Sequence, residues 1–232
     1  MPVELLDYPK ANIRIMVETQ WERAFRVRSA AKEPETTAWI DEHVQEGDVF
    51  WDIGANVGTY GLMAASRGTW LVWCFEPEEA NYIRLLQNMN LNSAFQIAAD
   101  QIAFSDATTV GHLNVTHGGI AGAANNHLAD EGQEVEVYRL DDWIRMRGAD
   151  RPTHVKIDVD GHELQVVRGG IETLQACKTV MIEIDHETEG AEDEIRSVFD
   201  GFDEEVFYRS ANVYNHLFVR STGDVALEPE GA

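Results

Sequence analysis

The sequence predicts an α/β fold in which a mostly parallel β-sheet is covered by helices on both faces. Apolar runs of strand length alternate with helix-like segments along most of the chain, which is typical of buried parallel strands separated by helices. Two C-terminal segments, EVFYRS and YNHLFVR, instead alternate polar and apolar residues, as an antiparallel pair closing a sheet edge does. With 232 residues, 44% of them hydrophobic, the chain can bury one full core, so we expect a single domain.

The expected elements follow in chain order. Residues 1–46 form an N-terminal lead-in whose helix begins near Pro34, because proline suits the first turn of a helix. The core spans 47–220, and the tail 221–232 is expected to be flexible. Within the core we predict strands at 49–53, 71–75, within 95–104, at 153–159 and at 179–184, and helices at 59–66, 79–91, after 159 and at 192–199. Between Asp106 and Arg139, short alternating pieces around small residues predict a hairpin insertion.

The charge balance limits the partners that we expect. Asp and Glu number 41 against 18 Lys and Arg, a formal charge of −23, and such a surface repels phosphate backbones, so we expect no nucleic-acid partner. No apolar run approaches the roughly 20 residues that span a bilayer, and the first residues lack a secretory pattern, so we expect a cytoplasmic protein without membrane contact. Cys74 and Cys177 have no metal-ligand spacing and are interpreted as buried free thiols. The sequence leaves a homo-oligomer open.

A glycine-rich turn between two apolar runs, VFWDIGANVGTYGLMAA (Val49–Ala65), indicates a ligand site. Ligands of open parallel sheets bind beyond the carboxyl ends of the strands, where this turn lies. Gly54, Gly58 and Gly61 lack a Cβ where the backbone bends sharply or approaches a ligand closely, and the helix that follows offers free N–H groups. Glu76 ends the next strand, and a carboxylate at this distance accepts both hydroxyls of a ribose in nucleotide-binding folds.

The spacing of the glycines differs from the dinucleotide fingerprint G-x-G-x-x-G. Asp52, two residues before Gly54, is poorly placed for a pyrophosphate and well placed for an ammonium group. S-adenosylmethionine combines an ammonium group, a ribose and an adenine without a phosphate, so we predict it as the cofactor. An ordinary strand-to-helix turn capped by Asp52 is the alternative that needs no ligand.

The sequence resembles the FkbM-type methyltransferases in segments that keep the family's order over roughly residues 35–185: GDVFWDIGANVG, FEPEEANYIRLLQNMNLN, IAFSD, YRLDDWI, VKIDVDGHELQVVRGG and MIEID. The combination of DIGANVG with VKIDVDGHE is specific. The resemblance implies a class I, Rossmann-like methyltransferase fold with a seven-stranded sheet. It also implies methyl transfer from S-adenosylmethionine, most often to a hydroxyl oxygen of a sugar, glycan or natural product.

By position, the resemblance implies donor-binding residues in the loop and at two strand ends. These are Asp52, Gly54, Ala55, Asn56 and Gly58 in the loop, Glu76 at the ribose, and Ser105 and Asp106 near the adenine. For Ser105 and Asp106, a simple pair of turn residues is the alternative.

The segment VKIDVDGHELQVV ends the fourth strand of the parallel series. Lys156 and Asp158 lie on the same side of that strand, and because a buried unpaired charge is costly, they pair with each other or face a cleft. A structural ion pair without a chemical role is the alternative. Carboxylates suit Mg²⁺, but Asp158, Asp160 and Glu163 lack a supporting ligand pattern, so we expect no metal site.

Methyl transfer from a sulfonium to a neutral hydroxyl needs a group that accepts the hydroxyl proton. The catalytic candidates are Asp158 with Lys156, Glu183 at the end of the fifth strand, and the histidines His162 and His186. Placement at strand ends favours Asp158. Each histidine has a polar position at the rim of the site as its alternative.

Two other classes of function remain open. An NAD-type oxidoreductase uses the same topology, and a non-catalytic nucleoside-binding module keeps the fold without the chemistry. The presence of Asp52, Glu76 and Asp158 argues against the binding module. The acceptor cannot be identified from the sequence.

Salt dependence tests the hypothesis that the acidic surface reflects a halophilic source. The lysines are few, and concentrated salt screens the repulsion among the many carboxylates. We predict that the folded protein loses stability as the salt concentration is lowered, which melting curves at low and molar salt measure. Equal melting temperatures at both concentrations would contradict the hypothesis.

Overall fold

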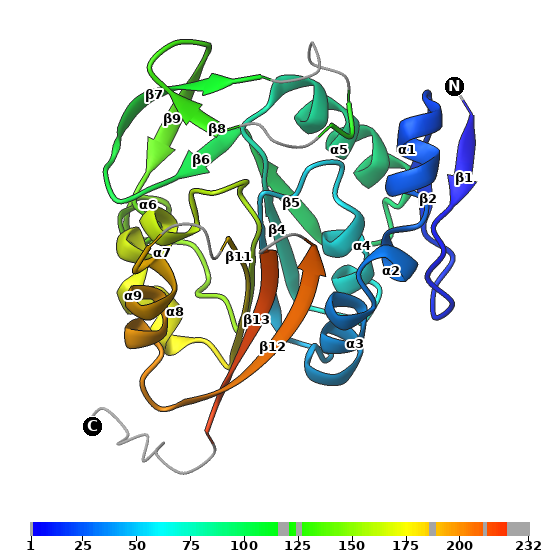
Figure 1. The fold of residues 1–232 in the computed structure, drawn as a ribbon. Coiled ribbons are helices and arrows are strands. Elements are labelled where there is room, and N and C mark those ends of the chain that lie inside the picture. Colours follow the sequence, from blue (N-terminus) through cyan, green and yellow to red (C-terminus); the bar gives the residue numbers. More distant parts are fainter. Residues whose placement is uncertain (1, 116–120, 124–126, 186–188, 211–212, 222–232) are drawn as a thin grey trace.

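The computed structural model describes residues 2–115, 121–123, 127–185, 189–210 and 213–221. Within them, seven strands form the main sheet (Figure 1). In spatial order these strands are β12 (Phe202–Ser210), β13 (Val213–Arg220), β11 (Thr179–Asp185), β10 (His154–Ile157), β3 (Val49–Ile53), β4 (Leu71–Phe75) and β5 (Ile97–Asp100). Parallel pairing joins β11 through β5, whereas β13 lies antiparallel between β11 and β12. The predicted α/β class, with its antiparallel C-terminal pair, is confirmed.

The helices cover both faces of this sheet (Figure 1). Their bounds are α1 (Gln20–Phe25), α2 (Ser29–Lys32), α3 (Pro34–His43), α4 (Thr59–Ala65), α5 (Glu79–Leu91), α6 (Leu140–Arg147), α7 (Glu163–Gly169), α8 (Ile171–Ala176) and α9 (Ala191–Val198). The helices predicted in the core are present, and α3 begins at Pro34 as expected. In the described residues, no helix is both long and apolar enough to cross a membrane.

Strand β3 shows why both faces of the sheet are buried. All five of its residues are buried, and successive side chains of a strand point to opposite faces. Phe50 packs against Trp39 of α3, with the ring centroids 5.4 Å apart. Trp51 packs against Trp143 of α6 on the other face, at 5.3 Å. One strand therefore contributes to two hydrophobic cores, and the whole strand is fixed in position.

A second sheet interrupts the alternation between β5 and α6. Its strands, in spatial order, are β6 (Ile102–Phe104), β9 (Gln133–Tyr138), β7 (Thr109–Asn114) and β8 (His127–Ala129). Strands β7 and β9 form the predicted antiparallel pair, and residues 116–120 and 124–126 of the insertion lie outside the described residues. The strand predicted within 95–104 is divided between the two sheets. Asp100 pairs in the main sheet and Ile102 in the second, so the chain changes sheets at the exposed Gln101.

The lead-in contains more structure than the sequence predicts. A hairpin of β1 (Val3–Leu5) and β2 (Arg14–Met16) precedes α1 and α2. Helix α5 supplies a partner for the backbone of β2, because Asn88 Oδ1 accepts the Met16 N–H at 2.8 Å. Apolar residues of the lead-in belong to the same core cluster as those of α4 and β3. Strands of three residues are too short to show a hydrophobic period, so the sequence does not reveal them.

Three further expectations concern the two cysteines, the C-terminal tail and the number of domains. Cys74 and Cys177 are buried free thiols, as predicted. The tail that we expect to be flexible lies, from residue 222 onward, outside the described residues. The organisation of 1–232 as one domain stays a prediction.

Candidate active site

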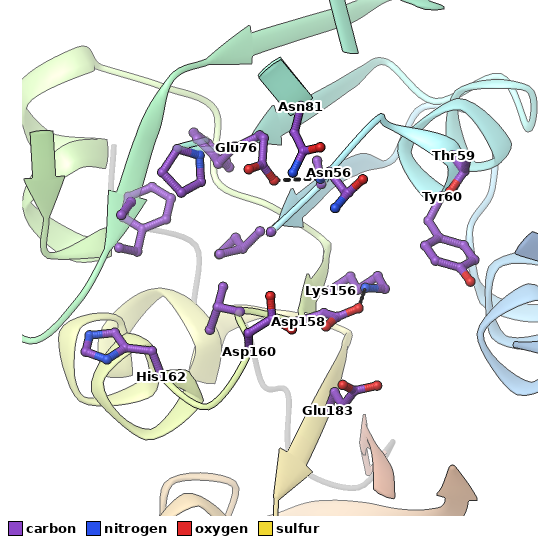
Figure 2. A pocket seen from close by; sticks show the side chains of 18 of the residues that line it. Asn56, Thr59, Tyr60, Glu76, Asn81, Lys156, Asp158, Asp160, His162 and Glu183 are labelled. Carbon is purple, nitrogen blue, oxygen red and sulfur yellow. Dashed lines mark hydrogen bonds and ion pairs between the residues drawn. The ribbon is translucent and has the colours of Figure 1, made fainter. Parts of the chain in front are cut away.

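A cavity opens at the carboxyl ends of β3, β4, β10 and β11, the position expected for a ligand of an open parallel sheet (Figure 2). The side chains that line it are apolar where the second sheet forms the wall and charged where the main sheet does. The second sheet contributes apolar side chains: Ile102, Phe104, Leu113 and Leu128. The main sheet and the start of α3 contribute charged ones: Glu33, Lys156, Asp158, Glu183 and Arg209.

Ionisable side chains of the main sheet share one of its faces. The register pairs Lys156 with Asp52 on β3 and with Met181 on β11. Side chains alternate along a strand, so Asp158 and Glu183, two residues after Lys156 and Met181, return to that face at the carboxyl edge. The fold therefore brings the carboxylates of Asp158 and Glu183 into one cavity wall.

The glycine-rich turn is held in place by backbone hydrogen bonds. The N–H groups of Gly54 and Ala55 both donate to the carbonyl of Phe75 at 3.0 Å. Asn56 adopts a left-handed backbone with φ of 52°, and its N–H donates to Glu76 Oε2 at 2.7 Å. Gly54, Ala55 and Asn56 line the cavity, so the turn presents mainly backbone to a ligand.

The glycines of the turn bend the chain, as expected, but their close contacts are with the protein itself. Gly54 and Gly58 have φ of 80° and 84°. A Cβ on Gly54 would lie 1.8 Å from the carbonyl oxygen of Asp158, and one on Gly58 or Gly61 would lie 2.4 or 2.5 Å from a buried side chain. Gly58 does not line the cavity. The sharp bend expected at these glycines is therefore present, and a close approach of the turn to a ligand stays a prediction.

Asp52 lies behind the cavity wall rather than in it. The residue is 1% exposed, and its Oδ2 accepts the N–H of Gly61 in the first turn of α4 at 2.9 Å. Among the described residues, Oδ1 has no hydrogen-bond partner. Burial raises the pKa of Asp52 to about 6, although the ammonium of Lys156 acts to lower it. The carboxylate holds the N-terminus of α4 against β3, and a contact with a donor ammonium stays a prediction.

Glu76 directly follows β4 and lines the cavity beside Asn81 (Figure 2). One oxygen accepts the N–H of Asn56 at 2.7 Å and the other accepts that of Glu78 at 3.0 Å. Burial raises the pKa of Glu76 to about 7, while these N–H groups act to lower it. Each carboxylate oxygen can accept more than one hydrogen bond, so Glu76 can still accept hydrogen bonds from a ligand.

Lys156 and Asp158 form an ion pair with Nζ and Oδ2 2.6 Å apart. Lys156 is 3% exposed, and its Nζ lies 5.0 Å from the centre of the Tyr60 ring. Burial by itself would raise the pKa of Asp158 and lower that of Lys156. Their mutual attraction, together with the charges of Asp52 and Glu33 on Lys156 and of Lys32 and Arg209 on Asp158, outweighs burial, so the pKa of Asp158 is lowered and that of Lys156 is raised. Both groups are therefore charged at neutral pH.

Glu183 is the neighbouring carboxylate on β11. The charge of Asp158, followed by burial, raises the pKa of Glu183 to about 8. Nε of Arg209 on β12 lies 3.3 Å from its Oε2, and the same guanidinium contacts Glu33 at 2.7 Å and Glu35 at 3.4 Å. Glu183 therefore keeps a proton to a higher pH than Asp158 does.

His162 lines the cavity, and its Nε2 lies 2.9 Å from Ser105 Oγ. Burial lowers the pKa of His162, against the raising effect of the Asp106 carboxylate. Ser105 and Asp106 themselves do not line the cavity but stand behind His162. Ser105 and Asp106, which we predict to lie near the adenine, are thus separated from the cavity by His162.

The turn after β10 is held by Glu163, whose Oε1 accepts the N–H groups of Val159 and Gly161, both at 3.1 Å. This carboxylate, which the sequence offers as a metal ligand, is thus occupied with the backbone. In the parts of the chain that the structure describes, no group of three or more His, Cys, Asp or Glu side chains is arranged to hold a metal ion.

Most of the residues indicated by the sequence meet at the cavity. Those that line it are Gly54, Ala55, Asn56, Glu76, Lys156, Asp158, His162 and Glu183. Those outside its wall are Asp52, Gly58, Ser105 and Asp106. His186 lies outside the described residues.

The lining residues that sequence reasoning missed include Glu33, Tyr60, Asn81 and Arg209. Tyr60 and Asn81 lie in the first turns of α4 and α5, directly after the two motifs, so the position of a polar residue at a helix start could have indicated them. Arg209 is a cation in an otherwise acidic and apolar strand. Glu33 has no signal in the sequence, because its cation partner Arg209 comes from a distant segment of the chain.

The chain is similar in sequence to a family of known proteins and to two characterised relatives. The profile of the methyltransferase FkbM domain family matches residues 52–210. The hexuronic acid methyltransferase AglP of Haloferax volcanii is 27% identical over 164 residues, covering 70% of this chain and 66% of that protein. The 2-O-methyltransferase NoeI of Sinorhizobium fredii is 28% identical over 153 residues, covering 58% of this chain and 62% of that protein. The chain therefore spans less than two thirds of the length of both relatives.

Among solved structures, yhhF of Escherichia coli, described as a methyltransferase, shares the fold. Its TM-score is 0.55 at 11% identity, and the match covers 95% of this chain and 99% of that one. The Rossmann-like methyltransferase architecture expected from the sequence is thereby confirmed.

The contact of Gly54 with Asp158 predicts a specific loss of stability. Gly47 has nearly the same backbone conformation, φ of 86°, but a Cβ there would meet nothing within 4 Å. We predict that Gly54→Ala lowers the free energy of unfolding by about 1–3 kcal/mol more than Gly47→Ala, because only the first adds a clash to the backbone strain. Denaturant unfolding of both variants measures the difference. Equal losses of unfolding free energy in the two variants would contradict the prediction, because they would show that a Cβ on Gly54 fits beside the Asp158 carbonyl without a clash.

Proposed function

Because the chain belongs to the FkbM methyltransferase domain family, we propose that it transfers a methyl group from S-adenosylmethionine to a hydroxyl of a sugar or glycan. The observation that carries the proposal is that apolar side chains of the second sheet, Glu76 and the charged residues at the ends of β10 and β11 line one cavity. In the main sheet, β4, which precedes Glu76, lies between β5, which leads into the second sheet, and the strands β3, β10 and β11. The donor presents an adenine, a ribose and a charged methionine part in the same order. The oxidoreductase alternative is not favoured, since the matched family and relatives are methyltransferases.

The residues present fit this donor. Ile102 and Phe104 offer an apolar surface for the adenine, and Glu76 has acceptor capacity left for the ribose hydroxyls. The backbone of Gly54–Asn56 borders the space between them. We assign Asp52 an indirect role through the N-terminus of α4, and Ser105 with Asp106 an indirect role through His162.

We infer the chemical class of the acceptor from the charged end of the cavity and from the names of the two relatives. One relative is named for a hexuronic acid and the other for 2-O-methylation, so both names fit sugar chemistry. Ion-paired carboxylates and cations offer many donors and acceptors to hydroxyl groups. The formal charge of −23 further supports a carbohydrate or small-molecule acceptor over a nucleic acid.

The donor supplies a methyl group activated by a positively charged sulfur, and it is consumed as a second substrate. The protein has to orient the acceptor oxygen in line with the carbon–sulfur bond, exclude water and accept a proton. Asp158, Glu183 and Tyr60 surround the space where this alignment would occur.

Calorimetry and a transfer assay test the proposal together. The protein should bind S-adenosylhomocysteine and not NAD. It should also move a labelled methyl group from S-adenosylmethionine to at least one member of a panel of neutral hexose and hexuronic acid methyl glycosides. Binding of NAD alone, or transfer to none of the glycosides, would overturn it.

Glu76 provides a direct test of the donor site. We predict that Glu76→Ala weakens S-adenosylhomocysteine binding by about 1–3 kcal/mol, the scale of a lost charge-assisted hydrogen bond, which is roughly a 5- to 150-fold rise in Kd. Glu79→Ala, which removes an exposed carboxylate three positions along the chain, should leave Kd unchanged. Calorimetry on both variants, with melting temperatures to confirm folding, makes the comparison. An unaltered Kd in Glu76→Ala would remove Glu76 from the donor site.

A further inference from the structure

Two carboxylates, Asp158 and Glu183, occupy the carboxyl ends of neighbouring parallel strands, and both line the cavity (Figure 2). The last register pair of β10 and β11 joins Ile157 to Ile182, and Asp158 and Glu183 are the residues that directly follow these two. Two adjacent like charges disfavour each other, so the surrounding cations decide which carboxylate holds a proton.

Asp158 has a cation of its own. Its Oδ2 lies 2.6 Å from Nζ of the buried Lys156. Moving either partner would leave a buried charge without its nearest counter-charge, which is strongly unfavourable. Asp158 is therefore held in its charged form as half of an ion pair.

In the described part of the chain, Glu183 has no cation to itself, and the cation that contacts it is shared with other carboxylates. Nε of Arg209 lies 3.3 Å from its Oε2, while the same guanidinium is closer to Glu33, at 2.7 Å, and also reaches Glu35, at 3.4 Å. One cation divided among three carboxylates compensates Glu183 less than Lys156 compensates Asp158. Of the two adjacent carboxylates, Glu183 has the greater affinity for a proton.

Building on the proposed function, we propose that Glu183 takes the proton of the acceptor hydroxyl, and that Asp158, fixed in place by its ion pair with Lys156, is the neighbouring negative charge that keeps Glu183 basic. In this step the hydroxyl oxygen forms a bond to the methyl carbon while the carbon–sulfur bond breaks and leaves its electron pair on sulfur. The hydroxyl proton passes to a carboxylate oxygen of Glu183. The products are a methyl ether and S-adenosylhomocysteine, and Glu183 then releases its proton to solvent.

This assignment differs from the one that strand position favours, which is Asp158. A carboxylate locked to an ammonium at 2.6 Å is a weak proton acceptor, because protonation would break the pair. His162 is also less suitable, since its Nε2 already contacts Ser105 Oγ at 2.9 Å and it lies apart from Glu183 in Figure 2.

If Glu183 is the base, the rate of methyl transfer should increase as the pH rises and Glu183 loses its proton. Glu183 is faced by Asp158 and Lys156 from β10, by Glu33 ahead of α3 and by Arg209 from β12. The charge of Asp158 and then burial raise the pKa of Glu183 to about 8, while the two cations act to lower it. Because the base must be deprotonated to act, the rate should rise with pH up to about 8 and then level.

The kinetic test compares three variants on the glycoside that accepts the methyl group. In Glu183→Gln, turnover should fall by about 10²- to 10⁴-fold and the acidic limb of the pH–rate profile should disappear, with Kd for S-adenosylhomocysteine little changed. In Asp158→Asn, the limb should persist per folded molecule but move to lower pH, because the charge that raises the pKa of Glu183 is gone. Glu194→Gln removes an exposed carboxylate paired with Arg168 and should change neither property.

A titration independent of turnover follows Glu183 directly. In protein labelled with carboxyl-¹³C glutamate, one resonance should titrate near pH 8. That resonance should be absent from Glu183→Gln and should titrate at lower pH in Asp158→Asn.

Three results would overturn the assignment. They are full turnover with the acidic limb intact in Glu183→Gln, no carboxyl resonance titrating near pH 8, and an alkali-labile methyl ester as product, since a carboxylate acceptor has no proton to give up. Failure of the unaltered protein to bind S-adenosylhomocysteine or to transfer methyl would instead overturn the proposed function. The two failures are therefore distinguishable.

Discussion

A buried ammonium group at the carboxyl edge of the main sheet is the constraint on which the rest of the site depends. Lys156 is enclosed between β3, β11 and the ring of Tyr60, where an uncompensated charge would be very costly. Asp158 compensates it at 2.6 Å, and the charge thereby fixed on Asp158 makes the adjacent Glu183 hard to ionise. Arg209 then stabilises that neighbour from β12. The charged groups of the cavity therefore form one connected series in which two neighbouring carboxylates lie between two cations: Lys156, Asp158, Glu183, Arg209 and Glu33.

The backbone ties this series to the glycine-rich turn. Gly54 packs against the carbonyl of Asp158, and the Asp158 N–H donates to the carbonyl of Ile53 at 3.0 Å. The same turn is joined to the end of β4, because the N–H of Asn56 donates to Glu76. A displacement of the turn would therefore move both ends of the cavity. Methyl transfer requires two substrates to be aligned to within a fraction of an ångström, and a single connected layer of backbone meets that requirement.

The sequence predicts the part of this arrangement that local patterns encode. Apolar runs identify the parallel strands, and the carboxylates that interrupt or end them, Glu76, Asp158 and Glu183, mark the cavity. The partners that distinguish these carboxylates are not encoded locally: Arg209 and Glu33 are 176 positions apart and meet only in the folded chain. The glycines of the turn show the same limit. Their positions indicate that a side chain is excluded, but only the packing reveals which atoms of the protein an added Cβ would meet.

A crystal structure with S-adenosylhomocysteine would test most directly whether one cavity holds the donor between Glu76 and Glu183. We predict that both ribose hydroxyls lie within hydrogen-bond distance of the Glu76 carboxylate and that the adenine packs against Phe104. The sulfur should face the space between Tyr60 and Glu183. A ligand bound outside this cavity, or one whose sulfur faces the second sheet and whose adenine lies beside Glu183, would contradict the account.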